Sequence, residues 1–269
     1  MAEGQSPGEV RRVAIVANPK VEAGYTDRLV SALERGGVEV TEVREQGEPD
    51  GDSRPDLVFV LGGDGTMLRA SRSFPDRVLL GVNLGTVGFM SGMQPKDLEA
   101  GVEKVLAGHY HVQNYRMLEV RIDGGEARYA INDAVLLKPR PHQITAVDLS
   151  VSGESLVHLQ CDGFIAATPL GSTAYALSAG GPIVSGDTPC FVLVAIAPHS
   201  LVARPLVLGE DQVARLELVE RESLLSVDGD EPFGLPVGSS VEIGLSSRSV
   251  RIGRTDGWSW WRAVRRTFL

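Results

Sequence analysis

The sequence predicts an α/β unit with a mainly parallel sheet, followed by a mostly β unit. Up to about residue 110, short apolar runs alternate with segments of helical periodicity, and from Tyr115 onward apolar residues alternate with charged ones. The first pattern is typical of βαβ units, and the second of antiparallel strands with one buried face. A chain of 269 residues allows one large domain or two modest ones, and we place the boundary where the period changes.

The first half is expected to contain strands at residues 13–17, 38–43, 56–61 and 78–82. A helix with Leu29 and Leu33 on its apolar face follows the first strand, and Gly36 and Gly37 can end it because glycine tolerates a left-handed cap. A short helix is expected at residues 67–71, and Pro95 begins another.

In the second half, Leu118, Val120 and Ile122 alternate with charged residues and lead into a hairpin turn at residues 123–125. Helical patterns are few beyond this turn. Further short strands are expected at residues 131–137, 144–151, 156–161, 191–197, 213–219 and 241–245.

Charge and cysteine content limit the class of protein. The formal net charge is -9, and Arg262, Arg265 and Arg266 form the one local basic cluster, so we expect neither nucleic acid nor a membrane as a partner. Two cysteines 29 positions apart, Cys161 and Cys190, do not make a disulfide framework. With no signal sequence or apolar span, these features indicate a cytoplasmic protein.

The first candidate site is Gly62-Gly63-Asp64-Gly65-Thr66, which follows a buried strand and precedes a helix. An open parallel sheet presents its ligand crevice at this position. Glycines let backbone N–H groups approach a phosphate, and the helix N-terminus adds a favourable partial charge. A carboxylate in such a loop can hold a cation or accept a proton from an attacking hydroxyl. The alternative is a glycine-rich turn with an aspartate cap.

A second glycine loop, residues 83–89, follows the strand at residues 78–82. It contains Asn83, Gly85 and Gly88. The carboxyl ends of parallel strands meet at one edge of a sheet, so both loops can line one crevice, with Asn83 donating to a ribose or phosphate oxygen. Alternatively, the stretch is only a tight exit from the strand.

The longest candidate is the stretch at residues 162–182, DGFIAATPLGSTAYALSAGGP. It shows neither strand nor helix patterning, so we expect a long irregular loop with a function. Its Ser and Thr hydroxyls can bond base edges or ribose, Tyr175 can pack from the side, and Asp162 can bind a ribose diol. The alternative is an irregular loop of a β domain.

Several common catalytic signatures are absent from the sequence. No lysine follows a glycine, which excludes a Walker A loop, and there is no GxGxxG for a standard dinucleotide-binding turn. HExxH and GxSxG are absent too.

Together, the three stretches resemble the NAD kinase family, whose members phosphorylate the 2′-hydroxyl of the adenosine ribose of NAD to give NADP. The likeness runs from about Val13 to the C-terminus. Residues 62–66 are shared with phosphofructokinase and lipid kinase relatives, whereas residues 162–182 are highly specific. The family's order is also kept by Asn132-Asp133, residues 83–89, Pro198-His199 and Asp228-Gly229-Asp230.

The resemblance implies a role for each matching position and makes Asp64 the catalytic carboxylate. Its implied phosphate loops contain Gly62, Gly63, Thr66, Asn83, Gly85 and Gly88. Its implied NAD-binding residues are Asp64, Gly65, Arg69, Asn132, Asp133, Gln160, Asp162, Thr173, Ala174, Tyr175, Ala176, Leu177, Ser178, Ala197 and Asp230. Asn132 and Asp133 would hold the adenosine half, while Gln160, Asp162 and Ala197 would lie near the other nucleoside. No metal site formed by the protein alone is implied.

The family's architecture implies an α/β domain at residues 1–112, to which residues 247–269 return, and an all-β sandwich-like, NAD-binding domain at residues 113–246. It also implies a homodimer or homotetramer in which neighbouring subunits complete the pocket. Two positions depart from the family: Asp133 stands where a glutamate is usual, and Leu170 where a hydroxyl residue is usual.

The implied reaction transfers a phosphoryl group from ATP or inorganic polyphosphate, with Mg²⁺ or another divalent cation accompanying the donor. Asp64 is placed to act as base, as orienter of the hydroxyl or as metal contact. Two other functions fit parts of the sequence: a lipid or sugar kinase of the same superfamily, which needs only the first glycine loop, and a non-catalytic dinucleotide sensor, which needs only the pocket.

Overall fold

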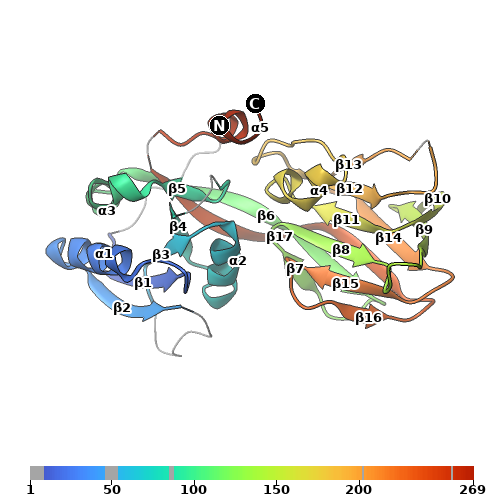
Figure 1. The fold of residues 1–269 in the computed structure, drawn as a ribbon, viewed down its shortest axis with the longest axis horizontal. Coiled ribbons are helices and arrows are strands. Elements are labelled where there is room, and N and C mark those ends of the chain that lie inside the picture. The colour runs from blue at the N-terminus through green and yellow to red at the C-terminus, as the bar shows by residue number, and fades with distance from the viewer. Residues whose placement is uncertain (1–8, 46–53, 85–87, 202, 256) are drawn as a thin grey trace. The chain divides into compact units, whose positions relative to one another are not determined.

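The computed structural model describes residues 9–45, 54–84, 88–201, 203–255 and 257–269. The chain forms two compact units, Met1–Asn114 with Val250–Leu269, and Tyr115–Ser249. Figure 1 shows helices over a sheet in the first unit and mainly strands in the second. The predicted fold class is confirmed, since the first unit is α/β with a parallel sheet and the second is built from antiparallel strands.

The first unit contains β1 (Arg12–Ala17), α1 (Ala23–Arg35), β2 (Glu39–Arg44), β3 (Leu57–Gly62), α2 (Asp64–Ser73), β4 (Val78–Asn83), β5 (Ser91–Met93), the 3₁₀ turn η1 (Pro95–Asp97) and α3 (Leu98–Leu106). Its strands pair in parallel in the order β2-β1-β3-β4-β5. Every residue of β3 and β4 is buried, which explains why both strands are continuous apolar runs.

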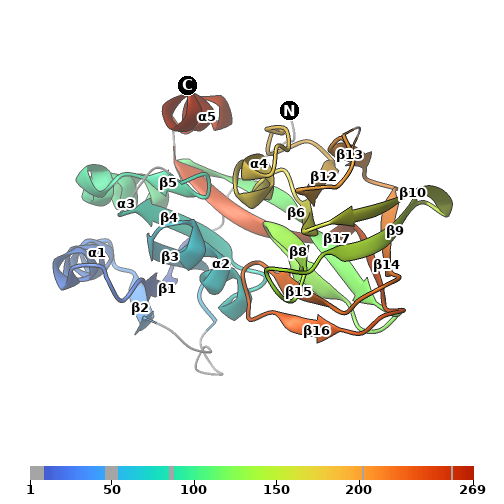
Figure 2. The same cartoon turned by 45° about the vertical axis from the view of Figure 1, so that its right-hand side comes forward.

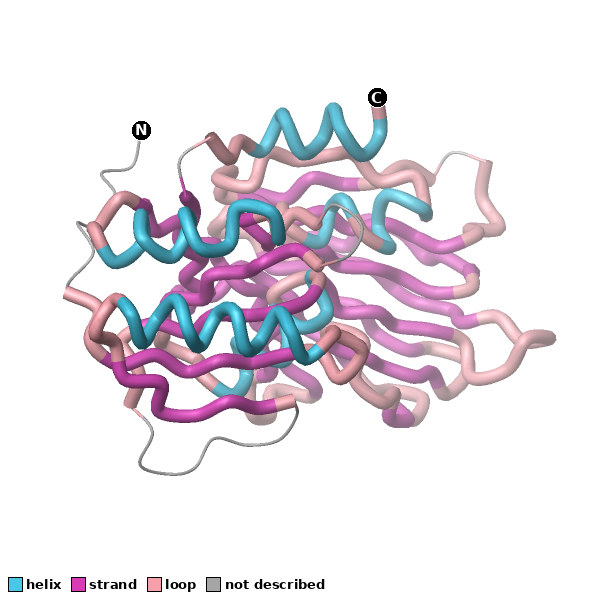
Figure 3. Tube along the Cα trace, turned by 60° about the vertical axis from the view of Figure 1, so that its left-hand side comes forward, coloured by secondary structure: helices cyan, strands magenta, loops and turns pink. Residues whose placement is uncertain are grey.

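Helices cover both faces of this sheet. The apolar residues of α1 and α3 pack with Ile15, Phe59 and Leu80 in one core cluster, and Figure 3 shows these two helices in front of the strands. On the other face lies α2, whose Met67 is 3.0 Å from the position that a Cβ on Gly81 would take. The strand residues alternate between these two layers, as a pleated strand requires.

One of the predicted helix boundaries in this unit moves. The second helix begins at Asp64 rather than at residue 67, so the glycine loop is shorter than the apolar pattern indicated. The element that Pro95 begins is a 3₁₀ turn that continues as α3. The helix after the first strand ends as predicted, with Gly36 as its C-cap and Gly37 in the left-handed conformation at a φ of 74°.

The end of the chain completes the first unit. β17 (Ser240–Thr255) begins in the second unit and ends in the first, where Arg251 and Ile252 pair in parallel with β4. It is followed by α5 (Trp260–Phe268), whose N-cap Ser259 accepts a hydrogen bond from the Arg262 N–H (3.2 Å). No helix of the described residues is long and apolar enough to cross a membrane.

The second unit consists of short strands and two helical turns. Its elements are β6 (Tyr110–Ile122, which starts in the first unit), β7 (Arg128–Ala130), β8 (Asp133–Leu137), β9 (Thr145–Val151), β10 (Glu154–Cys161), β11 (Gly163–Ala167), η2 (Gly171–Thr173), α4 (Tyr175–Ser178), β12 (Cys190–Ile196), β13 (Leu206–Gly209), β14 (Val213–Leu218), β15 (Ser223–Val227) and β16 (Phe233–Leu235).

These strands form two sheets with one core between them (Figure 2). One sheet has the order β10-β9-β14-β17, with β6 next to β17, and the other has the order β13-β12-β11-β8-β15-β16. Leu149, Leu216 and Val241 from the first sheet pack with Phe164 and Phe191 from the second. The outer face of the second sheet buries a smaller cluster that includes Ala176 of α4.

The prediction of an irregular loop over residues 162–182 is wrong for its first part. Gly163–Ala167 forms β11, a central strand with all five residues buried, and η2 and α4 follow. The sequence GFIAA lacks alternation because both of its faces are covered, one by the main core and the other by α4. The genuinely irregular segment is therefore shorter than expected.

Candidate functional site

The glycine loop of the first unit lies where β3 ends and α2 begins. Gly62 ends the strand, and Asp64 is the first residue of the helix. The carbonyl of Gly63 accepts hydrogen bonds from the N–H groups of Thr66 (2.9 Å) and Met67 (3.2 Å), which starts the helix immediately after the strand. The loop thus occupies the carboxyl edge of the parallel sheet, where such folds bind their ligands.

Asp64 is held by the backbone of the segment that follows β4. Its Oδ2 accepts a hydrogen bond from the Phe89 N–H (2.9 Å) and its Oδ1 from the Met90 N–H (3.1 Å). A Cβ on Gly88 would lie 2.3 Å from Oδ1, so this close approach requires glycine. Each carboxylate oxygen keeps a second lone pair, with which Asp64 can accept a proton or contact a cation.

Thr66 joins this loop to two other parts of the first unit. Its buried Oγ1 accepts hydrogen bonds from Asn18 Nδ2 (3.4 Å) and Arg69 Nη2 (3.3 Å). Arg69 is exposed one turn into α2. No motif of the sequence singled out Asn18, although its place directly after a predicted strand puts it on the same edge of the sheet.

The second glycine loop begins beside the first. β3 and β4 are in register with Gly62 opposite Asn83, whose side chain is only 4% exposed. The structure therefore brings Asn83 and Gly88 to the same sheet edge as Asp64. Gly85 lies outside the described residues.

In the second unit, three strand ends meet at one end of the second sheet. β8 begins at Asp133, β11 ends at Ala167 and β15 ends at Val227. Both neighbours pair with β8 in the antiparallel sense, so residues that precede β8 and residues that follow β11 and β15 come together.

Asp228 fixes the backbone in front of β8. Its carboxylate accepts hydrogen bonds from the N–H groups of Ile131 (2.7 Å), Asn132 (2.7 Å) and Asp133 (3.1 Å). These three bonds hold the Asn132-Asp133 segment in one conformation. In the sequence, Asp228 is only part of the Asp228-Gly229-Asp230 motif that resembles the family. In the structure, its carboxylate positions the backbone of residues 131–133. Asp230, two residues later, is exposed at the same end of the sheet.

Asp133 is buried near the Asp228 carboxylate, with 8% of its surface exposed. Burial, and then the charge of Asp228, raises the pKa of Asp133 to about 7, because both effects disfavour its ionised form. Near neutral pH a fraction of the Asp133 side chains is therefore protonated and can donate a hydrogen bond as well as accept one.

The segment after β11 is locked against the backbone of residues 131–132. The Thr168 N–H donates to the Asn132 carbonyl (2.9 Å) and the Thr168 hydroxyl to the Ile131 carbonyl (2.5 Å). A Cβ on Gly171 would lie 2.1 Å from the Asn132 carbonyl oxygen, which makes glycine necessary there.

Most hydroxyl groups of this segment bind its own backbone. Ser172 Oγ donates to the Pro169 carbonyl (2.7 Å), and Thr173 Oγ1 donates to the Leu170 carbonyl (2.9 Å). Thr168 and Ser172 are 1% and 0% exposed. The expectation that hydroxyls of this stretch bond a nucleoside is therefore wrong for these two residues, which shape the loop instead.

The residues of α4 and its approach divide by exposure. Ala174, Tyr175 and Ser178 are exposed, and Thr173 and Leu177 are half-buried. Tyr175 leaves 44% of its surface open to a ligand. Ala176 is fully buried with Ile165 and Val194, so its side chain serves the core.

Gln160, Asp162 and Ala197 lie at the opposite end of β11. Asp162 directly precedes β11, and Ala197 follows β12. Asp162 forms an ion pair with Lys138 Nζ (2.6 Å), which the sequence did not indicate. A strand rises about 3.3 Å per residue, so the five residues of β11 separate Asp162 from Thr168 by roughly 20 Å.

Both parts of the chain match models of one family. Residues 11–110 match the ATP-NAD kinase N-terminal domain, and residues 131–255 match the ATP-NAD kinase C-terminal domain. The chain belongs to the NAD kinase family. The resemblance noted in the sequence is thereby confirmed, and the two matched ranges contain every site residue named above.

Individual members of the NAD kinase family are similar over most of the chain. The NAD kinase of Carboxydothermus hydrogenoformans is 38% identical over 225 residues, which are 81% of this chain and 79% of that protein. The NAD kinase of Thermobifida fusca is 35% identical over 272 residues, which cover 94% of this chain and 83% of that protein.

Two solved structures of NAD and NADH kinases share the fold. Yeast NADH kinase complexed with NADH superposes with a TM-score of 0.87 at 26% identity, covering 97% of this chain and 88% of the yeast chain. The NAD kinase of Archaeoglobus fulgidus in complex with ATP gives a TM-score of 0.81 at 28% identity, with coverages of 96% and 97%.

Replacing Gly171 tests the close packing of the loop after β11 against residues 131–132. Gly171→Ala should lower the free energy of unfolding by about 1 to 3 kcal/mol, because the new Cβ forces the loop away from the Asn132 carbonyl. Urea unfolding followed by far-UV circular dichroism measures the change. Gly234→Ala is the matched control, since no atom lies within 4 Å of its Cβ position; an equal loss in both variants would contradict the steric explanation.

The raised pKa of Asp133 predicts a pH dependence of stability. The folded protein retains a proton that the unfolded chain loses at its ordinary pKa of 3.8, so this group's contribution is complete below that value and is lost as pH rises through about 7. In the wild type, the free energy of unfolding should fall between pH 5 and pH 8 by on the order of 2 kcal/mol more than in Asp133→Asn.

Urea unfolding at four pH values between 5 and 8 measures this difference. Asp211→Asn is the control, because Asp211 is an exposed carboxylate of the same unit and its removal should leave the slope unchanged. A wild-type slope that persists in Asp133→Asn would show that another group is responsible.

Proposed function

We propose that the chain is an NAD kinase that transfers a phosphoryl group to the 2′-hydroxyl of the adenosine ribose of NAD, giving NADP. The observation that carries the proposal is Asp64, whose carboxylate is fixed by two backbone N–H groups in a glycine loop at the carboxyl edge of a parallel sheet. Membership of the NAD kinase family supplies the substrate class.

The related structures support the choice of substrates. The yeast relative is complexed with NADH and the archaeal relative with ATP. We assign NAD to this chain as the acceptor, with ATP as the donor and inorganic polyphosphate as the alternative donor. The implied phosphate loops, at residues 62–66 and 83–88, would face the donor.

Asp64 is suited to the acceptor side of the reaction. The attacking ribose hydroxyl must lose a proton as the phosphoryl group arrives, and a fixed carboxylate with free lone pairs can accept it. Because both oxygens are already held by N–H donors, the side chain needs no reorganisation before it does so. The same geometry allows Asp64 to orient the hydroxyl or contact a cation.

Mg²⁺ is the divalent cation that we expect to accompany the donor. Among the described residues, no group of three or more His, Cys, Asp or Glu side chains could hold a metal by itself. Phosphate oxygens and water would bind most of this cation, with one or two protein carboxylates, of which Asp64 is the candidate. Bound there, it would screen the charge of the donor.

The second unit supplies the nucleoside contacts in this proposal. Asn132, Asp133 and the exposed ring of Tyr175 would hold the adenosine half, with Asp230 at the rim. The group at the other end of β11, which includes Asp162, would meet a different nucleoside. The separation of roughly 20 Å along the strand supports two distinct subsites rather than one.

The chain is also proposed to act as a homodimer or homotetramer in the cytoplasm. β10 and β13 end their sheets, and Leu156, Val157 and Val207 on these strands are 49%, 41% and 55% exposed. An apolar sheet edge of this kind is usually covered by another chain. Both cysteines are buried free thiols, which suits a reducing compartment.

An assay of NADP formation tests the proposed function. Purified protein with NAD and Mg²⁺ should form NADP with ATP, with polyphosphate or with both, and each donor is supplied alone. Phosphorylation of a lipid or sugar without NADP formation would instead favour a kinase of the wider superfamily. Binding of NAD without turnover by any donor would identify a dinucleotide sensor.

Asp64→Asn should lower kcat by roughly 10² to 10⁴, the range for a positioned proton acceptor, and should leave NAD binding intact. Steady-state kinetics and calorimetric NAD binding measure the two effects. Asp76→Asn is the control, since Asp76 is an exposed carboxylate of the same unit. An Asp64→Asn enzyme that keeps more than about a third of the wild-type kcat would remove Asp64 from the chemistry.

A further inference from the structure

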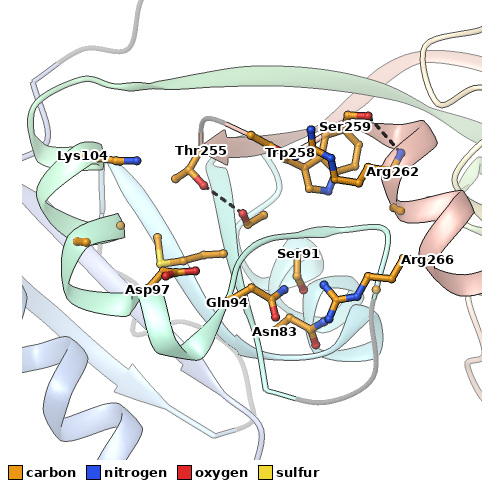
Figure 4. A pocket seen from close by; sticks show the side chains of 17 residues that line it. Asn83, Ser91, Gln94, Asp97, Lys104, Thr255, Trp258, Ser259, Arg262 and Arg266 are labelled. Carbon is orange, nitrogen blue, oxygen red and sulfur yellow. Dashed lines mark hydrogen bonds between the residues drawn. The ribbon is translucent and has the colours of Figure 1, made fainter.

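The first unit contains a polar pocket of about 430 Å³ between α3 and α5 (Figure 4). Its floor is the segment at residues 88–94, and Thr255 and Trp258 close one side. None of residues 62–66 lines it. The lining residues from Gly257 onward, which include those of α5, also lie beyond the ranges that match the family models. The pocket shares Asn83 and Gly88 with the implied phosphate loop at residues 83–88, whereas its α3 and α5 walls have no role in the proposed function.

Positive charge dominates the described lining of this pocket. Lys104 of α3 and Arg262 and Arg266 of α5 line it, against one carboxylate, Asp97. Arg262 and Arg266 are four positions apart on one helix and so share a face. Within the described part of the chain, none of these four groups forms an ion pair. In a protein with a net charge of -9, such a local excess of cations favours an anionic ligand.

The remaining lining indicates a small organic anion rather than a protein segment. Amide and hydroxyl groups from Asn83, Gln94 and Ser259 alternate with the indole of Trp258. The volume lies within the usual range for small-molecule sites, roughly 300 to 1,000 Å³. Guanidinium groups suit phosphate geometry because they donate two parallel hydrogen bonds.

The segment that forms the floor of the pocket also donates hydrogen bonds to the candidate catalytic carboxylate, Asp64. Gly88 lines the pocket, and the next two N–H groups donate to Asp64. The Phe89 ring packs on two aromatic residues of α5, Trp260 (5.0 Å between centroids) and Phe268 (5.8 Å). A ligand between α3 and α5 would therefore act on the segment that positions Asp64.

We propose that the pocket between α3 and α5 is an effector site for a small molecule that carries phosphate groups, separate from the phosphoryl-donor site. Lys104 and Arg266 bind the phosphates, with Arg262 completing the cationic wall, and Trp258 packs on the remainder of the molecule. Asp97 opposes the ligand and limits its affinity. Inorganic polyphosphates, nucleotides and sugar phosphates share this chemistry.

Tryptophan fluorescence gives a direct test, because the three tryptophans of the chain, Trp258, Trp260 and Trp261, all lie in or next to α5. The wild-type protein is titrated with tripolyphosphate, AMP or glucose 6-phosphate, without NAD or divalent cation and at constant ionic strength. At least one of these probes should give a saturable change, and which one does identifies the source of the phosphate groups. The absence of a saturable change with all three would overturn the proposal.

Charge variants then locate the binding. Lys104→Met and Arg266→Gln should each raise the dissociation constant by about tenfold, because each removes a charge-assisted hydrogen bond. Asp97→Asn should lower it. Arg265→Gln is the matched control: Arg265 neighbours Arg266 in the last turn of α5 but does not line the pocket, so affinity should stay within about twofold.

Equal weakening by Arg265→Gln and Arg266→Gln would show non-specific attraction to α5 and contradict the site. The kinase assay separates the pocket from the donor site: KM for ATP should stay within about twofold in Lys104→Met, and a rise of about tenfold would assign the pocket to the donor instead. The fluorescence titration needs no turnover, so it decides the binding proposal even if the proposed kinase activity fails its own assay.

Discussion

Two backbone N–H groups, from Phe89 and Met90, hold the Asp64 carboxylate, and the candidate active site of the first unit depends on this contact. It requires a glycine at position 88, because any side chain there would collide with Asp64. It also links the two glycine loops, which are separated in sequence but meet at the ends of β3 and β4. The buried parallel strands supply the rigidity, and the loops supply the polar groups.

In the second unit a carboxylate again binds backbone N–H groups, but here the carboxylate positions the backbone. There the carboxylate of Asp228 holds three successive backbone N–H groups, and the residues so fixed, Asn132 and Asp133, are the candidates for ligand contact. Burial, and then the charge of Asp228, raises the pKa of Asp133, which gives this side chain hydrogen-bonding options that an exposed aspartate lacks at neutral pH.

Contacts of Phe89 connect α5, at the end of the chain, to the segment that binds Asp64. Aromatic packing of Phe89 on α5, together with the hydrogen bond from buried Arg254 to the Phe89 carbonyl (2.6 Å), connects residues far apart in sequence to the loop that binds Asp64. A basic pocket bordered by the same helix is well placed to influence that loop. The three arginines that stand out in the sequence therefore have two different surroundings, since Arg262 and Arg266 line the pocket and Arg265 does not.

The sequence by itself determined the fold class, the strand-loop-helix position of Asp64 and the family, because periodicity and glycine spacing are local properties that one stretch of chain expresses. Tertiary structure decided what depends on neighbours. Gly163–Ala167 is a central strand only because α4 covers its outer face, and the Thr168 hydroxyl binds the Ile131 carbonyl only because the loop folds onto residues 131–132. The pKa of Asp133, the ion pair of Asp162 with Lys138 and the basic pocket likewise arise from contacts between distant segments, which no local pattern records.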